Sequence, residues 1–188
     1  MANPLLDRVR PAELADRGQV IEIKGFVGEF ERLEQIVESD LAALEKDERP
    51  RDWRLRPVAG RITFRWLDAR RTYPAAEGSL TAALAAVCQR CLEAFEMPLA
   101  ASFSILFADG DDGDAAEAAP GYEYYELDDG VLLLNDVVEE LLVMAMPLAP
   151  VHATREKCGA LAAKLPAEKA ETVRPFADLR AQIDRTKT

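Results

Sequence analysis

The feature that most restricts the fold of this chain is a long alternation of apolar and other residues between positions 95 and 107. An apolar residue at every second position is the pattern of a β-strand with one face buried and the other in water. The apolar residues on that face are Phe95, Met97, Leu99, Ala101, Phe103, Ile105 and Phe107. Pro98 within the stretch predicts an edge position or a bulge, because proline has no N–H to donate to a neighbouring strand.

Shorter patterns upstream predict further strands. Ile62, Phe64 and Trp66 alternate with polar residues and are followed by a turn at residues 68–71, which indicates a half-buried strand. The segment 79–87 is ambiguous, because its alanines favour a helix while its apolar residues also alternate. Its neighbours favour a strand. We therefore expect a meander of long antiparallel strands over about residues 53–108, with residues 88–91 in a tight turn.

Two other segments show the three-to-four residue spacing of a helix. The first covers about residues 30–46, after a short strand near residues 20–25. The second covers about residues 136–146, where Asp136 and Glu139 have the spacing of a capping box and Pro147 ends the helix. The predicted fold class is α+β, with an antiparallel sheet and two flanking helices.

Composition is consistent with a single folded domain spanning residues 1–188, since 49% of the residues are apolar and 30% are charged. A chain of this length can bury a core without needing a disulfide or a metal. No apolar run approaches the roughly 18 residues that span a bilayer, and three cysteines are too few for a disulfide framework. We expect a cytoplasmic protein with reduced thiols, a mobile acidic loop near residues 109–121 and a C-terminal extension near residues 159–188.

Charge is distributed unevenly along the chain, whose net charge is −11. Residues 109–140 hold twelve acidic residues and no basic one, whereas residues 51–71 hold seven arginines and two aspartates. Solvated surface is the ordinary explanation of such runs, but arginines also bind phosphates and acidic side chains. The candidate RNA-binding or partner-binding residues are Arg54, Arg56, Arg61, Arg65, Arg70 and Arg71. Calcium is not expected in the acidic run, because Gly113 and Asp114 break the register of an EF-hand loop.

Cysteine and histidine are confined to two short segments. The first contains Cys88 and Cys91, and the second contains His152 and Cys158. Two cysteines separated by two residues at a turn can chelate one tetrahedral ion, and one further cysteine and one histidine would complete a Cys₃His zinc site. Inert, partly buried thiols and a redox dithiol are the alternatives. A redox pair of the thioredoxin kind would be expected at the start of a helix, not at a turn between antiparallel strands.

Several motifs in this order resemble the YceD family, also called DUF177. They are residues 87–92 (VCQRCL), residues 138–142 (VEELL) leading into residues 146–152 (MPLAPVH), Cys158, and residues 174–179 (RPFADL). Members of that family are described as factors for the accumulation of large-subunit ribosomal RNA in bacteria and chloroplasts. Their genes commonly lie beside that of a large-subunit ribosomal protein. The resemblance implies a non-enzymatic role in the synthesis, processing or stability of that RNA.

Two classes of function follow from these observations. In the first, the chain is a ribosome biogenesis factor that contacts large-subunit ribosomal RNA, a ribosomal protein or both, and neither DNA nor a membrane. In the second, it is a thiol-dependent redox protein or sensor that uses Cys88 and Cys91. An enzyme of another kind is the weaker hypothesis, because one histidine gives little basis for a catalytic triad and no glycine-rich phosphate-binding loop is present.

Overall fold

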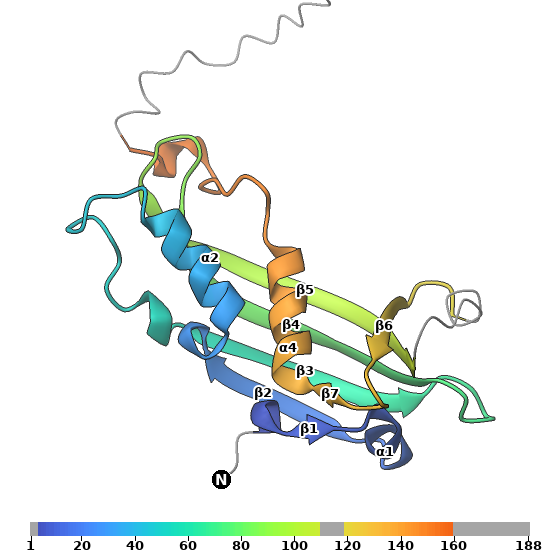
Figure 1. Cartoon of the computed structure of the whole chain (residues 1–188). Coiled ribbons are helices and arrows are strands. Elements are labelled where there is room, and N and C mark those ends of the chain that lie inside the picture. Colours follow the sequence, from blue (N-terminus) through green and yellow to red (C-terminus); the bar gives the residue numbers. More distant parts are fainter. Residues whose placement is uncertain (1–3, 110–118, 160–188) are drawn as a thin grey trace, which may run out of the picture.

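The computed structural model describes residues 4–109 and 119–159 (Figure 1). Its helices are α1 (Pro11–Asp16), α2 (Glu31–Leu41) and α4 (Leu134–Ala145). Its strands are β1 (Arg8–Val9), β2 (Val20–Phe26), β3 (Pro57–Trp66), β4 (Pro74–Val87), β5 (Ala94–Asp109), β6 (Glu123–Leu127) and β7 (Leu132–Leu133). Most of the predicted acidic loop and nearly all of the predicted C-terminal extension lie outside the described residues.

Five strands form one sheet in the order β2-β3-β4-β5-β6, and β1 pairs with β7 in a separate two-stranded sheet. The predicted antiparallel meander is confirmed, because β2, β3 and β4 each pair antiparallel with the strand that follows. The ambiguous segment 79–87 belongs to β4. A parallel strand, β6, joins β5 over Ile105–Asp109, which the alternation did not predict. Pro98 lies in the part of β5 that β6 does not reach, so it occupies an open edge as expected.

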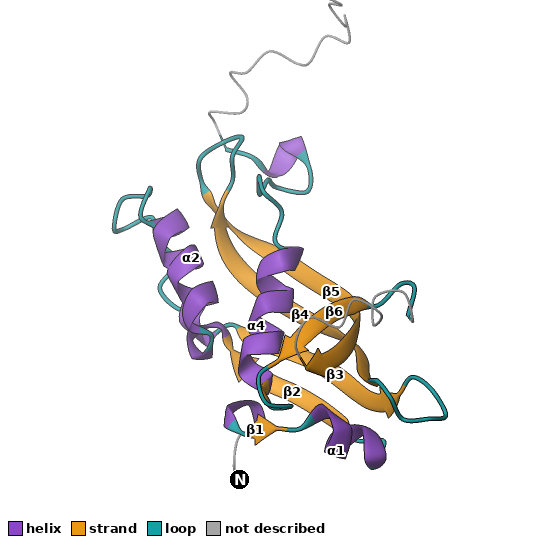
Figure 2. Cartoon of the chain, turned by 45° about the vertical axis from the view of Figure 1, so that its right-hand side comes forward, coloured by secondary structure: helices purple, strands orange, loops and turns teal. Residues whose placement is uncertain are grey.

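Helices α2 and α4 cover the same face of the sheet, which leaves two layers (Figure 2). Phe64, Leu84 and Phe107 are fully buried between the layers, and the rings of Phe64 and Phe107 stack with centroids 6.2 Å apart. The opposite face, which we call the outer face, carries small residues such as Ser79, Thr81 and Ser102, which are exposed. The alternation of apolar and small polar residues therefore arises because the helices cover only one face of the sheet.

Both helices differ from their predicted limits. The first ends at Leu41 and not near residue 46, because the chain turns there and Arg49 donates hydrogen bonds to the carbonyls of Ala42 and Leu44. The second begins at Leu134, so Asp136 lies in its first turn and does not cap it. Within the described residues, no helix combines the length and apolar character required to span a membrane.

Glu139 has a different role from the one its spacing predicted. Its side chain is 5% exposed, and its Oε1 accepts hydrogen bonds from the backbone N–H groups of Arg32 at 2.6 Å and Leu33 at 3.1 Å. These donors belong to the first turn of α2, where Phe30 offers no side-chain cap. A carboxylate from α4 thus satisfies the free N–H groups of α2 and favourably meets the positive end of its dipole.

We expect replacement of Glu139 by alanine to lower the free energy of unfolding by about 1–3 kcal/mol, because one buried and one partly buried backbone donor lose their acceptor. Urea denaturation of the purified protein would measure this change. The matched control is Glu140→Ala, which removes the neighbouring carboxylate from a half-exposed position of the same helix. Equal destabilisation by both substitutions would show that the cross-helix cap contributes nothing.

Candidate metal centre

The turn between β4 and β5 carries two of the four candidate ligands. The Cys88 N–H donates to the carbonyl of Glu93 at 3.0 Å, and the Leu92 N–H donates to the carbonyl of Cys88 at 2.8 Å. Leu92 has a φ of +62°, a left-handed conformation that closes the turn. Cys88 and Cys91 are both buried inside this turn, which lies where the sequence predicted it.

The other two ligands come from the segment after α4. The Gln89 N–H donates to the carbonyl of Pro150 at 2.8 Å, which docks the proline-containing segment against the cysteine turn. His152 follows directly, and its ring lies 4.6 Å from that of Phe95. A short 3₁₀ turn over Arg155–Lys157 then returns the chain, with the Cys158 N–H donating to the carbonyl of Arg155 at 3.1 Å.

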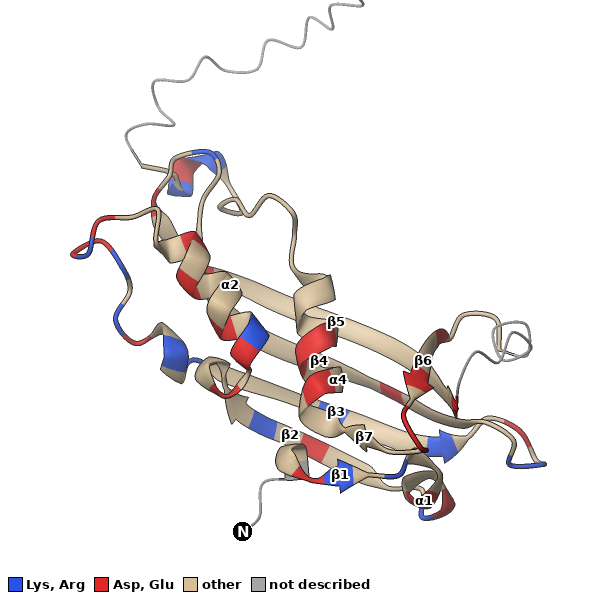
Figure 3. Ribbon diagram, viewed as in Figure 1, with Lys and Arg blue, Asp and Glu red and all other residues tan. Residues whose placement is uncertain are grey.

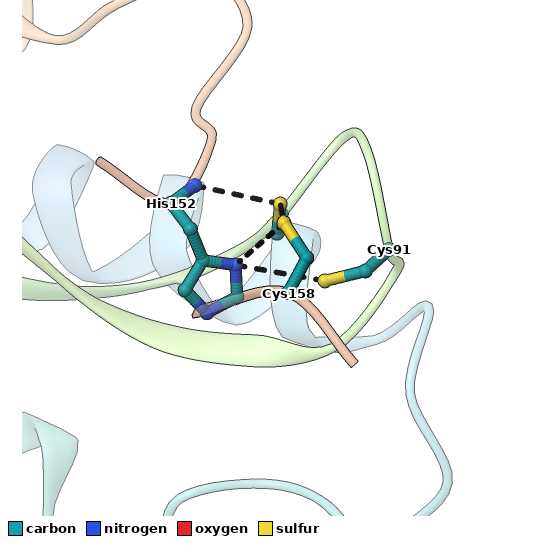
Figure 4. A group of neighbouring side chains, drawn as sticks. Cys91, His152 and Cys158 are labelled. Carbon is teal, nitrogen blue, oxygen red and sulfur yellow. Dashed lines mark hydrogen bonds between the residues drawn. The ribbon is translucent and has the colours of Figure 1, made fainter. Parts of the chain in front are cut away.

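The four side chains converge on one point, as the spacing predicted. Their possible ligand atoms all lie within 4.8 Å of one another. The Cys88 and Cys158 sulfurs are 4.0 Å apart. His152 Nδ1 lies 3.5 Å from the Cys91 sulfur and 3.6 Å from the Cys158 sulfur (Figure 4). Tetrahedral zinc with bonds of about 2.3 Å to sulfur and 2.0 Å to nitrogen requires edges of about 3.8 Å and 3.5 Å, so the arrangement fits such an ion.

Hydrogen bonding favours ionisation of one thiol. Burial opposes ionisation of Cys88, but backbone N–H groups of His152, Arg90 and Cys91 outweigh it and lower the pKa of this thiol to about 6. The His152 N–H lies 3.5 Å from the Cys88 sulfur. For Cys158, desolvation and then the neighbouring sulfurs of Cys88 and Cys91 raise the pKa. The site therefore offers a thiolate to a cation, and a bound cation would favour ionisation of the remaining thiols.

The chemistry that this arrangement supports is structural metal binding. Four protein ligands complete a tetrahedral shell and leave no position for a reactive water, which is the pattern of a structural zinc site. No other group of three or more cysteine, histidine or acidic side chains in the described part of the chain is arranged to hold a metal ion. Sequence spacing predicted the convergence of the four candidate ligands but not their supports, Phe95 and the Gln89–Pro150 hydrogen bond, which have no local pattern.

The candidate arginines do not gather into one patch. Arg61 and Arg65 lie on the outer face of β3, as predicted, with side-chain exposures of 67% and 44%. Arg61 pairs with Glu22 at 2.7 Å, and Arg65 pairs with Glu77 at 2.5 Å and contacts the Tyr122 hydroxyl at 2.6 Å. Trp66, the next residue of β3, is only half-buried, and its Nε1 donates to Asp16.

The other four arginines lie elsewhere. Arg54 pairs with Glu34 and Glu38 of α2 and stacks on Trp53, with its guanidinium 4.2 Å from the ring centroid. Arg56 pairs with Glu96 and donates to the carbonyl of Leu84. Arg70 and Arg71 lie in the turn after β3, where Arg71 pairs with Asp16 at 2.9 Å. Five of the six candidate arginines thus have carboxylate partners within the chain.

In metal-free, reduced protein, we expect the ultraviolet absorbance of thiolate to rise in a step near pH 6 that the Cys88→Ala variant lacks. The matched Cys158→Ala variant should keep this step. Since an unperturbed cysteine ionises near pH 8.5, the folded protein releases this proton earlier than the unfolded chain. The resulting stabilisation is present above about pH 8.5 and is lost as the pH falls towards 6. Persistence of the step in Cys88→Ala would contradict the assignment.

Comparison with known proteins connects this centre to a family. A family model described as "Large ribosomal RNA subunit accumulation protein YceD" matches residues 76–181, which is more than half of the chain. The matched segment contains all four candidate ligands and the hairpin that carries two of them. No curated protein and no solved structure matches the chain. Because the family model matches more than half of the chain, the chain belongs to the YceD family of large ribosomal RNA subunit accumulation proteins.

Proposed function

We propose that this protein is a non-enzymatic ribosome biogenesis factor, held together by a structural zinc ion, that supports the synthesis, processing or stability of large-subunit ribosomal RNA. The observation that carries the proposal is the convergence of Cys88, Cys91, His152 and Cys158 within the family-matched segment. The family description supplies the link to ribosomal RNA. The closed ligand set supports a binding role, because it has no position for substrate.

Zinc would join two parts of the chain that are distant in sequence. Cys88 and Cys91 come from the β4–β5 hairpin, while His152 and Cys158 follow α4. Zinc would thereby tie the sheet to the segment that leads into the C-terminal part of the chain. Because the ligands are distant in sequence, metal binding adds its free energy to that of folding.

A redox function is the second candidate, and the lowered pKa of Cys88 is the observation that favours it. The surroundings favour zinc. The cysteine pair lies in a turn between antiparallel strands. The distances from His152 Nδ1 to two of the sulfurs are those expected between two ligand atoms of one zinc ion. Metal content and free-thiol counts separate the two functions, because zinc masks thiols that a redox protein would expose.

We expect the purified full chain to contain about one equivalent of zinc by elemental analysis, as one tetrahedral site requires. Cys91→Ser and His152→Ala should each lose the metal and lower the free energy of unfolding by more than about 3 kcal/mol. Gln89→Ala is the matched control, because it changes an exposed side chain within the same turn. Metal-free protein with a stable, reversible Cys88–Cys91 disulfide would instead establish the redox function.

The outer face supplies the proposed RNA contact. Arg61 and Arg65 point into solvent from one face of β3, and their glutamate partners are also largely exposed. Exposed ion pairs contribute only about 0–1 kcal/mol, so phosphate groups can replace these glutamates at small cost. Arg54 and Arg56 are less accessible to RNA phosphates. The ion pair of Arg54 holds it against α2, and the hydrogen bond of Arg56 holds it against the carbonyl of Leu84.

We expect Arg61→Glu/Arg65→Glu to weaken binding to large-subunit ribosomal RNA and to reduce its salt slope by about two units, since each phosphate contact contributes about one. Glu22→Gln/Glu77→Gln, which releases the same arginines, should strengthen binding. Filter binding over a series of salt concentrations measures both effects, with thermal unfolding as a check on folding.

In cells, loss of the gene should lower the ratio of large-subunit to small-subunit ribosomal RNA. The unaltered gene should restore that ratio, and the arginine double variant should restore it less well. Unchanged RNA binding in the double variant would exclude this face. An unchanged RNA ratio after gene loss would contradict the proposed function as a whole.

A further inference from the structure

A cavity of about 380 Å³ lies between β6 and α4. We call it the β6–α4 groove, and its main lining residues are Ile105, Glu123, Val137, Glu140, Leu141 and Met144. Its floor is apolar, because Ile105, Val137 and Leu141 are buried members of the core. Its rim is acidic, since both charged lining residues are glutamates. The groove therefore combines an apolar floor with a negative entrance.

An apolar side chain at the rim is exposed without an evident structural need. Met144 is 64% exposed at the C-terminal end of α4, although most of the neighbouring helix face is buried. The flexible thioether of methionine adapts its shape to a partner, and for that reason methionine is common on docking surfaces. Next to the groove, β6 is the last strand of the sheet among the described residues.

The carboxylates around the groove differ from those next to β3. Glu22, Glu77 and Asp16 each pair with an arginine. In contrast, no lysine or arginine of the described residues forms an ion pair with Glu123, Glu126, Asp128, Asp136 or Glu140. Figure 3 shows that acidic residues are concentrated on β6 and on the first half of α4.

Nearby cations do not cancel this negative charge. Arg8 lines the adjoining recess together with Glu126, Asp128 and Asp136, so acidic groups outnumber it there. Arg32 of α2 acts electrostatically on Tyr125, but Glu140 and Asp136 oppose it more strongly. The field at the groove is therefore negative, which attracts cationic partners and repels nucleic-acid phosphates.

We propose that the β6–α4 groove binds a lysine-rich or arginine-rich segment of another protein that inserts one bulky apolar side chain. The apolar residue would cover Met144 and the groove floor, and the basic residues would pair with Glu123 and Glu140. A second copy of this chain is a poorer occupant, because each copy carries a net charge of −11. The inference rests on the proposed function in one respect: it names a basic protein as the partner of a ribosome biogenesis factor.

The test uses the zinc-loaded full chain and a fluorescein-labelled, lysine-rich dodecapeptide with a central Leu-Phe pair. Fluorescence anisotropy should show binding that weakens as salt increases. A peptide with serine in place of Leu-Phe should bind on the order of tenfold more weakly, because its apolar anchor is lost. A single-stranded RNA oligonucleotide should not compete for the groove.

Variants of the protein locate the binding site. Glu123→Lys/Glu140→Lys should lower the peptide affinity on the order of tenfold or more. The matched control is Glu45→Lys/Glu48→Lys, which makes the same charge change at exposed positions after α2 and should leave the affinity nearly unchanged. Equal loss in both double variants, or absence of peptide binding by the unaltered protein, would overturn the proposal.

A photo-crosslinking benzoylphenylalanine at position 144 identifies the occupant. Crosslinks to the peptide support the proposal. Crosslinks to the chain's own C-terminal part, to a second copy or to RNA would overturn it. Failure here is distinguishable from failure of the proposed function, because the Glu123/Glu140 double variant keeps the zinc ligands and both outer-face arginines. Retained zinc and RNA binding without peptide binding would reject only the groove.

Discussion

Antiparallel pairing of β4 with β5 is the constraint on which the rest of the structure depends. The pairing runs without interruption from Ala75 opposite Leu106 to Val87 opposite Ala94. This register places alternate residues of both strands beneath α2 and α4, and a shift by one residue would turn every apolar side chain to the outer face. The same register ends at the cysteine turn, so the core and two of the candidate metal ligands depend on one set of backbone hydrogen bonds.

The helices are joined to that hairpin by carboxylates as well as by apolar contacts. Glu139 of α4 caps the first turn of α2, and Asp40 near the end of α2 accepts a hydrogen bond from the Val87 N–H at 2.6 Å. Val87 immediately precedes Cys88. A line of contacts therefore runs from α4 through α2 to the turn that carries Cys88 and Cys91. Any movement of α2 along its axis would disturb these three hydrogen bonds.

Local sequence patterns predicted the parts of the fold that are determined by residues close together in the sequence. The alternation in β5 reflects a single buried face, and the cysteine and histidine spacings predicted the convergence of four candidate ligands. The capping role of Glu139 was not predictable in this way, because its acceptor atoms serve donors 106 and 107 residues away in sequence. The same holds for the parallel pairing of β6. For the arginines, sequence showed which residues face solvent but not that glutamates on neighbouring strands pair with them.

The pairing of charges also explains why the two sides of this sheet differ chemically despite the acidic composition of the chain. On the outer face, register places Arg61 directly opposite Glu22, so positive and negative side chains alternate at short range and largely cancel. Around β6 and α4, acidic residues outnumber the nearby Arg8 and Arg32, so the field there stays negative. Exposed ion pairs exchange partners readily, whereas an unpaired cluster attracts opposite charge from outside. One acidic chain can thus present an outer face of exchangeable ion pairs and a separate groove with a negative field.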